Sequence, residues 1–97
     1  MAFSITLMPD AQNDLIEIFD WYESKSEGLG ERFINSFDNR LNLLSKTPTI
    51  YPIRYESIRC SLIPDFPYLI HYESDLDFNR IIVYRVFHTS RKPFWED

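Results

Sequence analysis

The pattern of apolar and polar positions changes from alternation to helical spacing near the start of the chain. Phe3, Ile5 and Leu7 alternate with polar residues, which predicts a short strand with one buried face. Pro9 follows, and proline is well suited to the first turn of a helix. From there to Glu23 the apolar side chains recur at steps of three and four, which predicts a helix over about Pro9 to Glu23. The residues of this stripe are Ala11, Leu15, Ile18 and Tyr22.

A second helical pattern follows a link, Ser24 to Gly30, that contains both glycines of the chain. Its apolar positions predict a helix from about Leu29 to Ser45, which ends before Pro48 because proline disfavours helical angles in the residue before it. The stripe consists of Leu29, Phe33, Phe37, Leu41 and Leu44. Two amphipathic helices joined by a short link should form an antiparallel hairpin, and that hairpin needs a sheet to cover its apolar face.

The second half of the chain has the pattern of extended structure. We expect strands over Arg54 to Ile63 and Phe66 to Tyr72, and a last strand that starts at Arg80 after a polar connection. The last segment, RIIVYRVFHTSR, is so apolar that it is typical of a central strand covered on both faces. Arg85 interrupts it, which indicates that one of its faces is not fully covered.

The predicted fold class is therefore α+β, with the order β-α-α-β-β-β. We expect residues 1–97 to form one domain, in which an antiparallel sheet is packed on one face by the helix hairpin. No apolar segment approaches the ~20 residues needed to span a bilayer. The single cysteine, Cys60, excludes an internal disulfide, and the chain shows no basic-then-apolar leader. We expect a cytoplasmic protein with no membrane association.

The charge of the chain argues against broad, charge-driven binding to nucleic acid. The formal net charge is −5 and the sequence pI is about 4.9. The acidity lies mostly in the predicted helical half. A positive patch on the strands of the other half therefore stays compatible with the sequence.

Several short motifs, taken in order, resemble the ParE/RelE superfamily of toxins from bacterial type II toxin–antitoxin pairs. They cover nearly the whole chain, and their order and spacing carry the resemblance. The resemblance implies the fold predicted above, growth inhibition, plasmid stabilization and a cognate antitoxin that silences the toxin in a hetero-oligomer. The motifs are Pro9-Asp10-Ala11, Asp20-Trp21-Tyr22-Glu23, Gly28-Leu29-Gly30, Phe66-Pro67-Tyr68 and Val86-Phe87-His88, followed by Arg91, Pro93 and Trp95.

The superfamily divides by activity. ParE-like members poison DNA gyrase, whereas RelE-like members are endoribonucleases that cut mRNA on the ribosome without a metal. The tail with His88, Arg91 and Trp95 is more similar to the ParE branch, and the chain lacks the dense lysine and arginine content of the RelE-like nucleases. The resemblance thus favours a gyrase inhibitor. An mRNA endoribonuclease and a non-toxic member kept for partner binding remain the alternatives.

Cutting RNA without a metal requires a general base, a general acid and cations that hold the phosphate. Arg59, Arg85 and Arg91 carry guanidinium groups that pair with phosphate in a forked geometry. His88 has an ordinary pKa of about 6.5, which suits an acid or a base. These four residues are the candidate catalytic residues. In the plainer interpretation, His88 is a hydrogen-bonded residue at a strand end and the arginines bind a partner.

The candidate partner-binding residues are Arg59, Arg85, Arg91 and Trp95, which would meet acidic and apolar groups of the antitoxin. The sequence predicts no metal site and no cofactor, because two histidines and one cysteine are too few for an ordinary zinc site and no glycine-rich phosphate loop is present. His71 and Cys60 are expected to be structural residues of the sheet.

Overall fold

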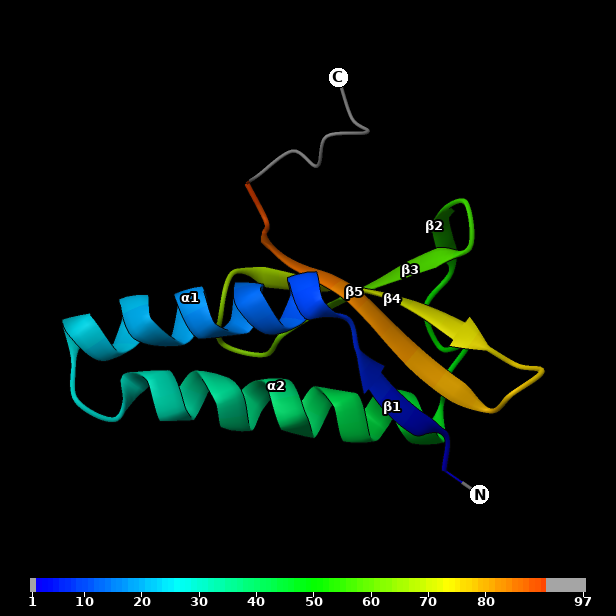
Figure 1. The fold of residues 1–97 in the computed structure, drawn as a ribbon, viewed down its shortest axis with the longest axis horizontal. Helices are drawn as coiled ribbons and strands as arrows, with labels where there is room; N and C mark the ends of the chain where they lie inside the picture. The colour runs from blue at the N-terminus through cyan, green and yellow to red at the C-terminus, as the bar shows by residue number, and fades with distance from the viewer. Residues whose placement is uncertain (1, 91–97) are drawn as a thin grey trace.

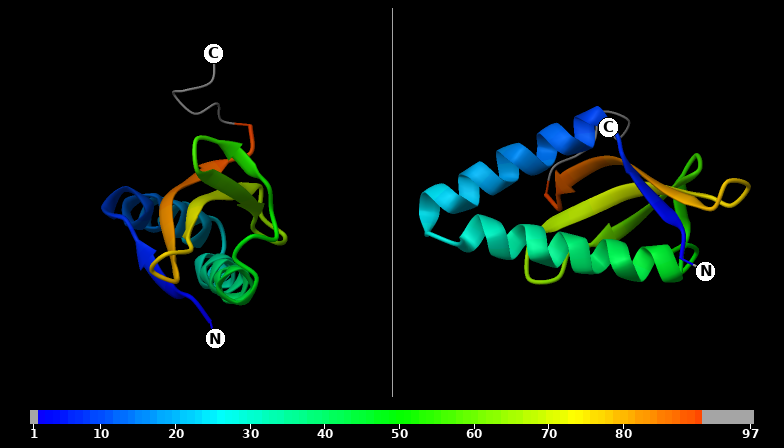
Figure 2. Two further views of the ribbon diagram at one scale, coloured as in Figure 1. Left: turned by 90° about the vertical axis from the view of Figure 1, so that its right-hand side faces the viewer. Right: turned by 60° about the horizontal axis from the view of Figure 1, so that its bottom comes forward.

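The protein is described here by a computed structural model that places residues 2–90; residues 1 and 91–97 are outside the described part. Two long helices form a hairpin that packs along a sheet (Figure 1). Figure 2 shows the same arrangement from the right-hand side of Figure 1 and turned so that its lower edge comes forward. The elements are β1 (Ser4–Leu7), α1 (Pro9–Lys25), α2 (Leu29–Lys46), β2 (Ile53–Tyr55), β3 (Ile58–Leu62), β4 (Tyr68–Asp75) and β5 (Arg80–His88).

The structure confirms the two helices that the apolar spacing predicted. Helix α1 starts at Pro9 as predicted and ends two residues beyond the expected Glu23, and α2 ends one residue beyond Ser45. The link between the helices and the first turn of α2 each depend on a glycine. Gly28 adopts φ 86°, which side chains disfavour. A Cβ atom at Gly30 would lie 2.7 Å from the backbone oxygen of Phe19, so only glycine fits there without a shift of α1.

The sheet has the strand order β1-β5-β4-β3-β2. The antiparallel pairing of the last three strands is confirmed, and β5 lies between two neighbours as expected of a central strand. The sheet as a whole is mixed rather than antiparallel, because β1 pairs in parallel with β5. No turn joins β1 to β5, so no hairpin imposes the antiparallel direction.

The prediction of a single strand over Arg54 to Ile63 was wrong. The chain turns at Glu56-Ser57 and forms two antiparallel strands, β2 and β3. Glu56 has φ 50°, a left-handed conformation that is uncommon for residues other than glycine. No glycine, asparagine or proline marks this turn in the sequence.

The main core lies between the helix hairpin and one face of the sheet. The opposite face, which we call the outer face, is also partly packed by the chain itself. Ile58, Cys60 and Phe87 on that face are 7%, 8% and 3% exposed. The main core contains Ala11, Leu15, Ile18, Phe33, Phe37, Leu41, Leu44, Ile63, Ile70, Tyr72, Ile81, Val83 and Val86. Neither described helix is long and apolar enough to cross a membrane.

Candidate functional site

Arg85 lies in the middle of β5, and its guanidinium binds the carboxylate of Asp14 on α1. Arg85 Nε donates to Asp14 Oδ2 at 2.8 Å, and Nη2 donates to Oδ1 at 3.0 Å. The backbone N–H of Val86 donates to the same carboxylate at 2.9 Å. The hydrogen bond to Asp14 raises the pKa of Arg85 above its ordinary value, although burial opposes it. Arg85 is therefore a permanent cation whose charge is matched within the chain.

Arg59 lies on the other face of the sheet. Its register partners are Tyr72 of β4 and, through Tyr72, Val83 of β5, and both of these belong to the main core. Arg59 Nη1 donates to the backbone oxygen of Tyr51 at 2.5 Å. Arg40 of α2 donates to the Tyr51 hydroxyl at 2.8 Å. Arg59 thus anchors the connection between α2 and β2 beneath the sheet.

The opposite placement of Arg59 and Arg85 has a definite cause. Tyr72 pairs with Val83, whereas His71 pairs with Arg85, so β5 contains one extra residue at Tyr84. A bulge of this kind shifts the phase of the strand. Without it Arg85 would lie on the same face as Val83. With it, Arg85 joins His71 on the outer face.

His88 ends β5 on the face that carries Tyr68, and the centres of the two rings are 5.2 Å apart. Its Nδ1 accepts from the backbone N–H of Ser90 at 3.1 Å and lies 2.8 Å from the Ser90 hydroxyl. This is the plainer of the two interpretations, a hydrogen-bonded residue at a strand end. Arg91 and Trp95 lie outside the described residues, so their roles stay predictions. The structure does not bring Arg59, Arg85 and His88 together.

The outer face contains a cluster centred on His71 that the sequence did not reveal. Cys60 Sγ lies 3.4 Å and the Tyr55 hydroxyl 3.2 Å from His71 Nδ1, and the Phe87 ring is 5.1 Å from the imidazole. Burial, together with the nearby cations Arg54 and Arg85, lowers the pKa of His71 to about 4, against the opposing effect of Asp14. His71 and Cys60 are buried, as expected of structural residues.

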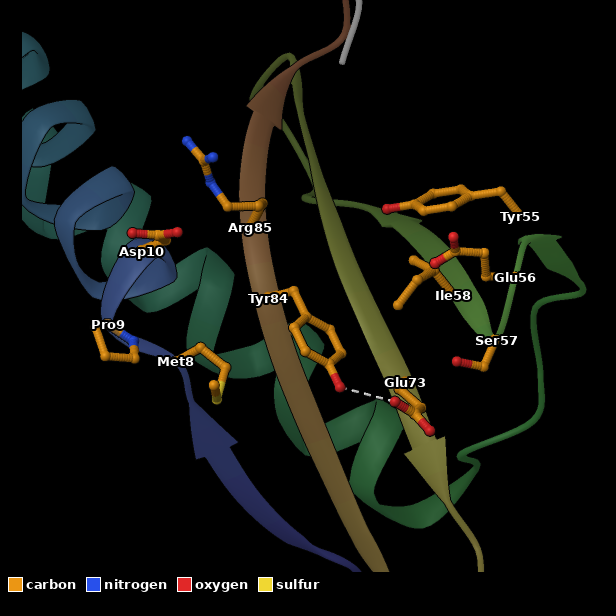
Figure 3. Close-up of a pocket in the computed structure, with 10 residues that line it drawn as sticks. All are labelled: Met8, Pro9, Asp10, Tyr55, Glu56, Ser57, Ile58, Glu73, Tyr84 and Arg85. Atoms are coloured by element: carbon orange, nitrogen blue, oxygen red, sulfur yellow. Dashed lines mark hydrogen bonds between the residues drawn. The ribbon is translucent and has the colours of Figure 1, made fainter. Parts of the chain in front are cut away.

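Beside this cluster, a groove of about 590 Å³ runs between the start of α1 and the β2–β3 turn (Figure 3). We call it the outer groove. Its apolar lining includes Met8, Ile58 and the ring of Tyr84, and Asp10, Glu56 and Glu73 contribute carboxylates. The Tyr84 hydroxyl donates to Glu73 Oε1 at 2.8 Å. The lining residues are Met8, Pro9, Asp10, Tyr55, Glu56, Ser57, Ile58, Glu73, Tyr84 and Arg85.

The charge of the outer groove differs from the positive surface that the sequence left open for this half of the chain. Asp10, Glu56 and Glu73 line it, and its one arginine is bound to Asp14. The acidity of the helical half agrees with the position of Asp10, whereas no local pattern of the sequence pointed to Glu56 and Glu73. Within residues 2–90, no group of three or more His, Cys, Asp or Glu is arranged to hold a metal ion.

Comparison with known proteins agrees with the fold. A family model described as "ParE toxin of type II toxin-antitoxin system, parDE" matches residues 5–93. A chain of the "Chromosomal ParDE TA system from P. aeruginosa" superposes with a TM-score of 0.78 at 14% identity, covering 92% of this chain and 98% of that one. No curated protein matches the sequence.

A second solved structure extends the similarity to the other branch. A chain of the toxin–antitoxin complex RelBE2 from Mycobacterium tuberculosis superposes with a TM-score of 0.68 at 18% identity, covering 94% of this chain and 95% of that one. These two likenesses establish the fold, and the family match spans nearly the whole sequence. The chain belongs to the ParE toxin family of type II toxin–antitoxin systems.

Proposed function

We propose that this toxin inhibits growth by binding DNA gyrase in the cytoplasm, and that a cognate antitoxin holds it inactive in a hetero-oligomer. The observation that carries the choice of target is the separation of Arg59 and Arg85 on opposite faces, each bound to a group of its own chain. A metal-free nuclease needs its cations and its acid or base around one phosphate. The described residues favour a protein that acts by binding.

The electrostatics of the outer groove support the same choice. Carboxylates on both walls repel the phosphates of RNA, and the net charge of −5 adds to this repulsion. A protein target has no such requirement for a positive surface.

Exposed apolar side chains support an antitoxin partner. Trp21, Ile53 and Leu62 are 54%, 53% and 50% exposed. A partner that wraps around the toxin would cover them, and we expect it to bury about 1,500 Å² or more. The two structural neighbours were both solved as parts of toxin–antitoxin systems, which is in line with such a partner.

A supercoiling assay with purified gyrase tests the target. We expect the toxin to inhibit supercoiling at micromolar concentration, and the product of the adjacent antitoxin gene to restore it. The matched assay is cleavage of ribosome-bound message, with the His88→Ala variant as its control. Unchanged supercoiling together with message cuts that disappear in His88→Ala would replace the gyrase proposal with the nuclease.

A further inference from the structure

The outer groove combines two walls of like charge with an apolar surface between them. Asp10 lies on the α1 side, whereas Glu56 and Glu73 lie on the β2–β3 side and on β4 (Figure 3). All three are partly or fully accessible to solvent. The groove therefore presents negative charge from two directions to anything that enters it.

The one cation that lines the groove, Arg85, offsets these carboxylates only in part. Arg85 is bound by two hydrogen bonds to the carboxylate of Asp14, which is not among the lining residues. Asp10 also interacts electrostatically with Arg85, so Glu56 and Glu73 are the carboxylates left without a cation among the lining residues. Arg54, whose charge lowers the pKa of His71, is not among the lining residues.

The apolar surface of the groove offers a place for side chains between the acidic walls. Met8 is 37% exposed at the α1 side, and Ile58 and the ring of Tyr84 face the same space (Figure 3). Tyr84 is held in position by its bond to Glu73. A segment that fits must present apolar groups to this surface and positive charge to the walls.

We propose that the outer groove binds a short amphipathic segment of the antitoxin, with lysine or arginine facing Asp10, Glu56 and Glu73 and apolar side chains over Met8 and Ile58. The proposal rests on the antitoxin partner of the proposed function and adds the chemistry of the segment. It reverses the polarity expected from the sequence, in which acidic antitoxin groups were to meet arginines of the toxin.

The first test uses the full-length toxin and a fluorescently labelled peptide of leucine and lysine, with a peptide of leucine and glutamate as its counterpart. We expect anisotropy to show binding of the lysine peptide only, with an affinity that falls as salt rises. The double variant Glu56→Gln/Glu73→Gln should bind about tenfold more weakly, since it loses two exposed charge pairs. Equal binding of the two peptides would overturn the proposal.

The matched control is the double variant Glu27→Gln/Glu31→Gln, which removes the same charge at two exposed positions, one in the link between the helices and one in the first turn of α2. We expect it to bind the lysine peptide within about twofold of the unmodified toxin. Amide shifts on peptide addition should concentrate at Met8, Ile58 and Tyr84. A control as weak as the groove variant, or shifts elsewhere on the molecule, would show attraction by net charge alone and reject the groove.

The second test identifies the occupant. The product of the adjacent antitoxin gene should displace the labelled lysine peptide from the toxin. Failure to displace it, or displacement by gyrase alone, would reject the antitoxin as the occupant. The supercoiling assay reads out independently, so loss of the gyrase target would leave the peptide and displacement results intact.

Discussion

Asp14 and Arg85 are 71 positions apart in the chain, and their side chains join α1 to β5 through two hydrogen bonds. Asp14 is 8% exposed, and its carboxylate also accepts a hydrogen bond from the backbone N–H of Val86. One carboxylate thus serves three donors, all from the strand. This contact fixes the start of the helix hairpin against the sheet.

Asp14→Asn should lower the free energy of unfolding by about 1–3 kcal/mol, because a buried amide loses the charge that holds Arg85 and cannot satisfy all three donors. Urea denaturation followed by circular dichroism measures the change. Asp20→Asn, at an exposed position of the same helix, should stay within about 0.5 kcal/mol. Equal losses in the two variants would show that Asp14 is not a special contact.

Gly30→Ala should destabilise the helix hairpin. Alanine favours a helix by up to about 1 kcal/mol, but its Cβ would lie 2.7 Å from the backbone oxygen of Phe19. The backbone oxygen of Phe19 cannot move away as the end of a flexible side chain can, so α1 must shift. The net loss in unfolding free energy should be about 1–3 kcal/mol. Thermal unfolding checks this. Asn35→Ala at an exposed position of α2 is the control. A melting temperature of Gly30→Ala as high as that of the control would contradict the close approach of α1 and α2.

The unfolding free energy should depend on pH through His71. Its pKa is lowered to about 4 in the folded protein, so between about pH 4 and 6.5 the unfolded chain binds more protons. Stability must therefore rise with pH across this window, by at most about 1.4 kcal/mol per unit. The contribution of His71 to the unfolding free energy is lost as pH falls through this window, and below pH 4 it no longer changes.

His71→Gln separates that effect from the titration of carboxylates, because glutamine does not titrate. Unfolding free energies at several pH values between 4 and 6.5 should show a shallower slope for the variant than for the unmodified protein. Parallel curves would mean that His71 keeps an ordinary pKa when folded. The charged groups that act on residue 71, Arg54, Arg85 and Asp14, are unchanged in the variant.

Arg59→Ala should lower stability by about 1–2 kcal/mol through the lost hydrogen bond to Tyr51. Arg32→Ala, an exposed arginine of α2, is the control. Growth inhibition by Arg59→Ala should fall only as far as its stability does. Loss of toxicity with an unchanged unfolding free energy would instead assign Arg59 a direct contact with the target or the antitoxin.

The sequence predicted the secondary structure well where the helical spacing of apolar residues runs without interruption. The apolar stripes from Ala11 to Tyr22 and from Leu29 to Leu44 predicted both helices to within two residues. The antiparallel pairing of the last three strands followed from their short connections. Such patterns depend only on near neighbours in the chain.

The candidate site was less predictable, because it depends on registers that no local pattern contains. A single extra residue at Tyr84 moves Arg85 to the face opposite Arg59. Strict alternation would have placed both arginines on the same face. The turn at Glu56 uses a left-handed residue without a glycine to mark it. Both features form only when distant strands pair, so composition and spacing do not show them.

The bond from Val86 to Asp14 also limits how the sheet can grow. Strand β1 covers the edge of β5 only from Arg80 to Val83, and the next amide that would invite an added strand, that of Val86, is already bound to the helix carboxylate. A chain that extends this sheet by backbone pairing must therefore do so along β1 or β2. Pairing beyond Val83 would first require α1 to be lifted away.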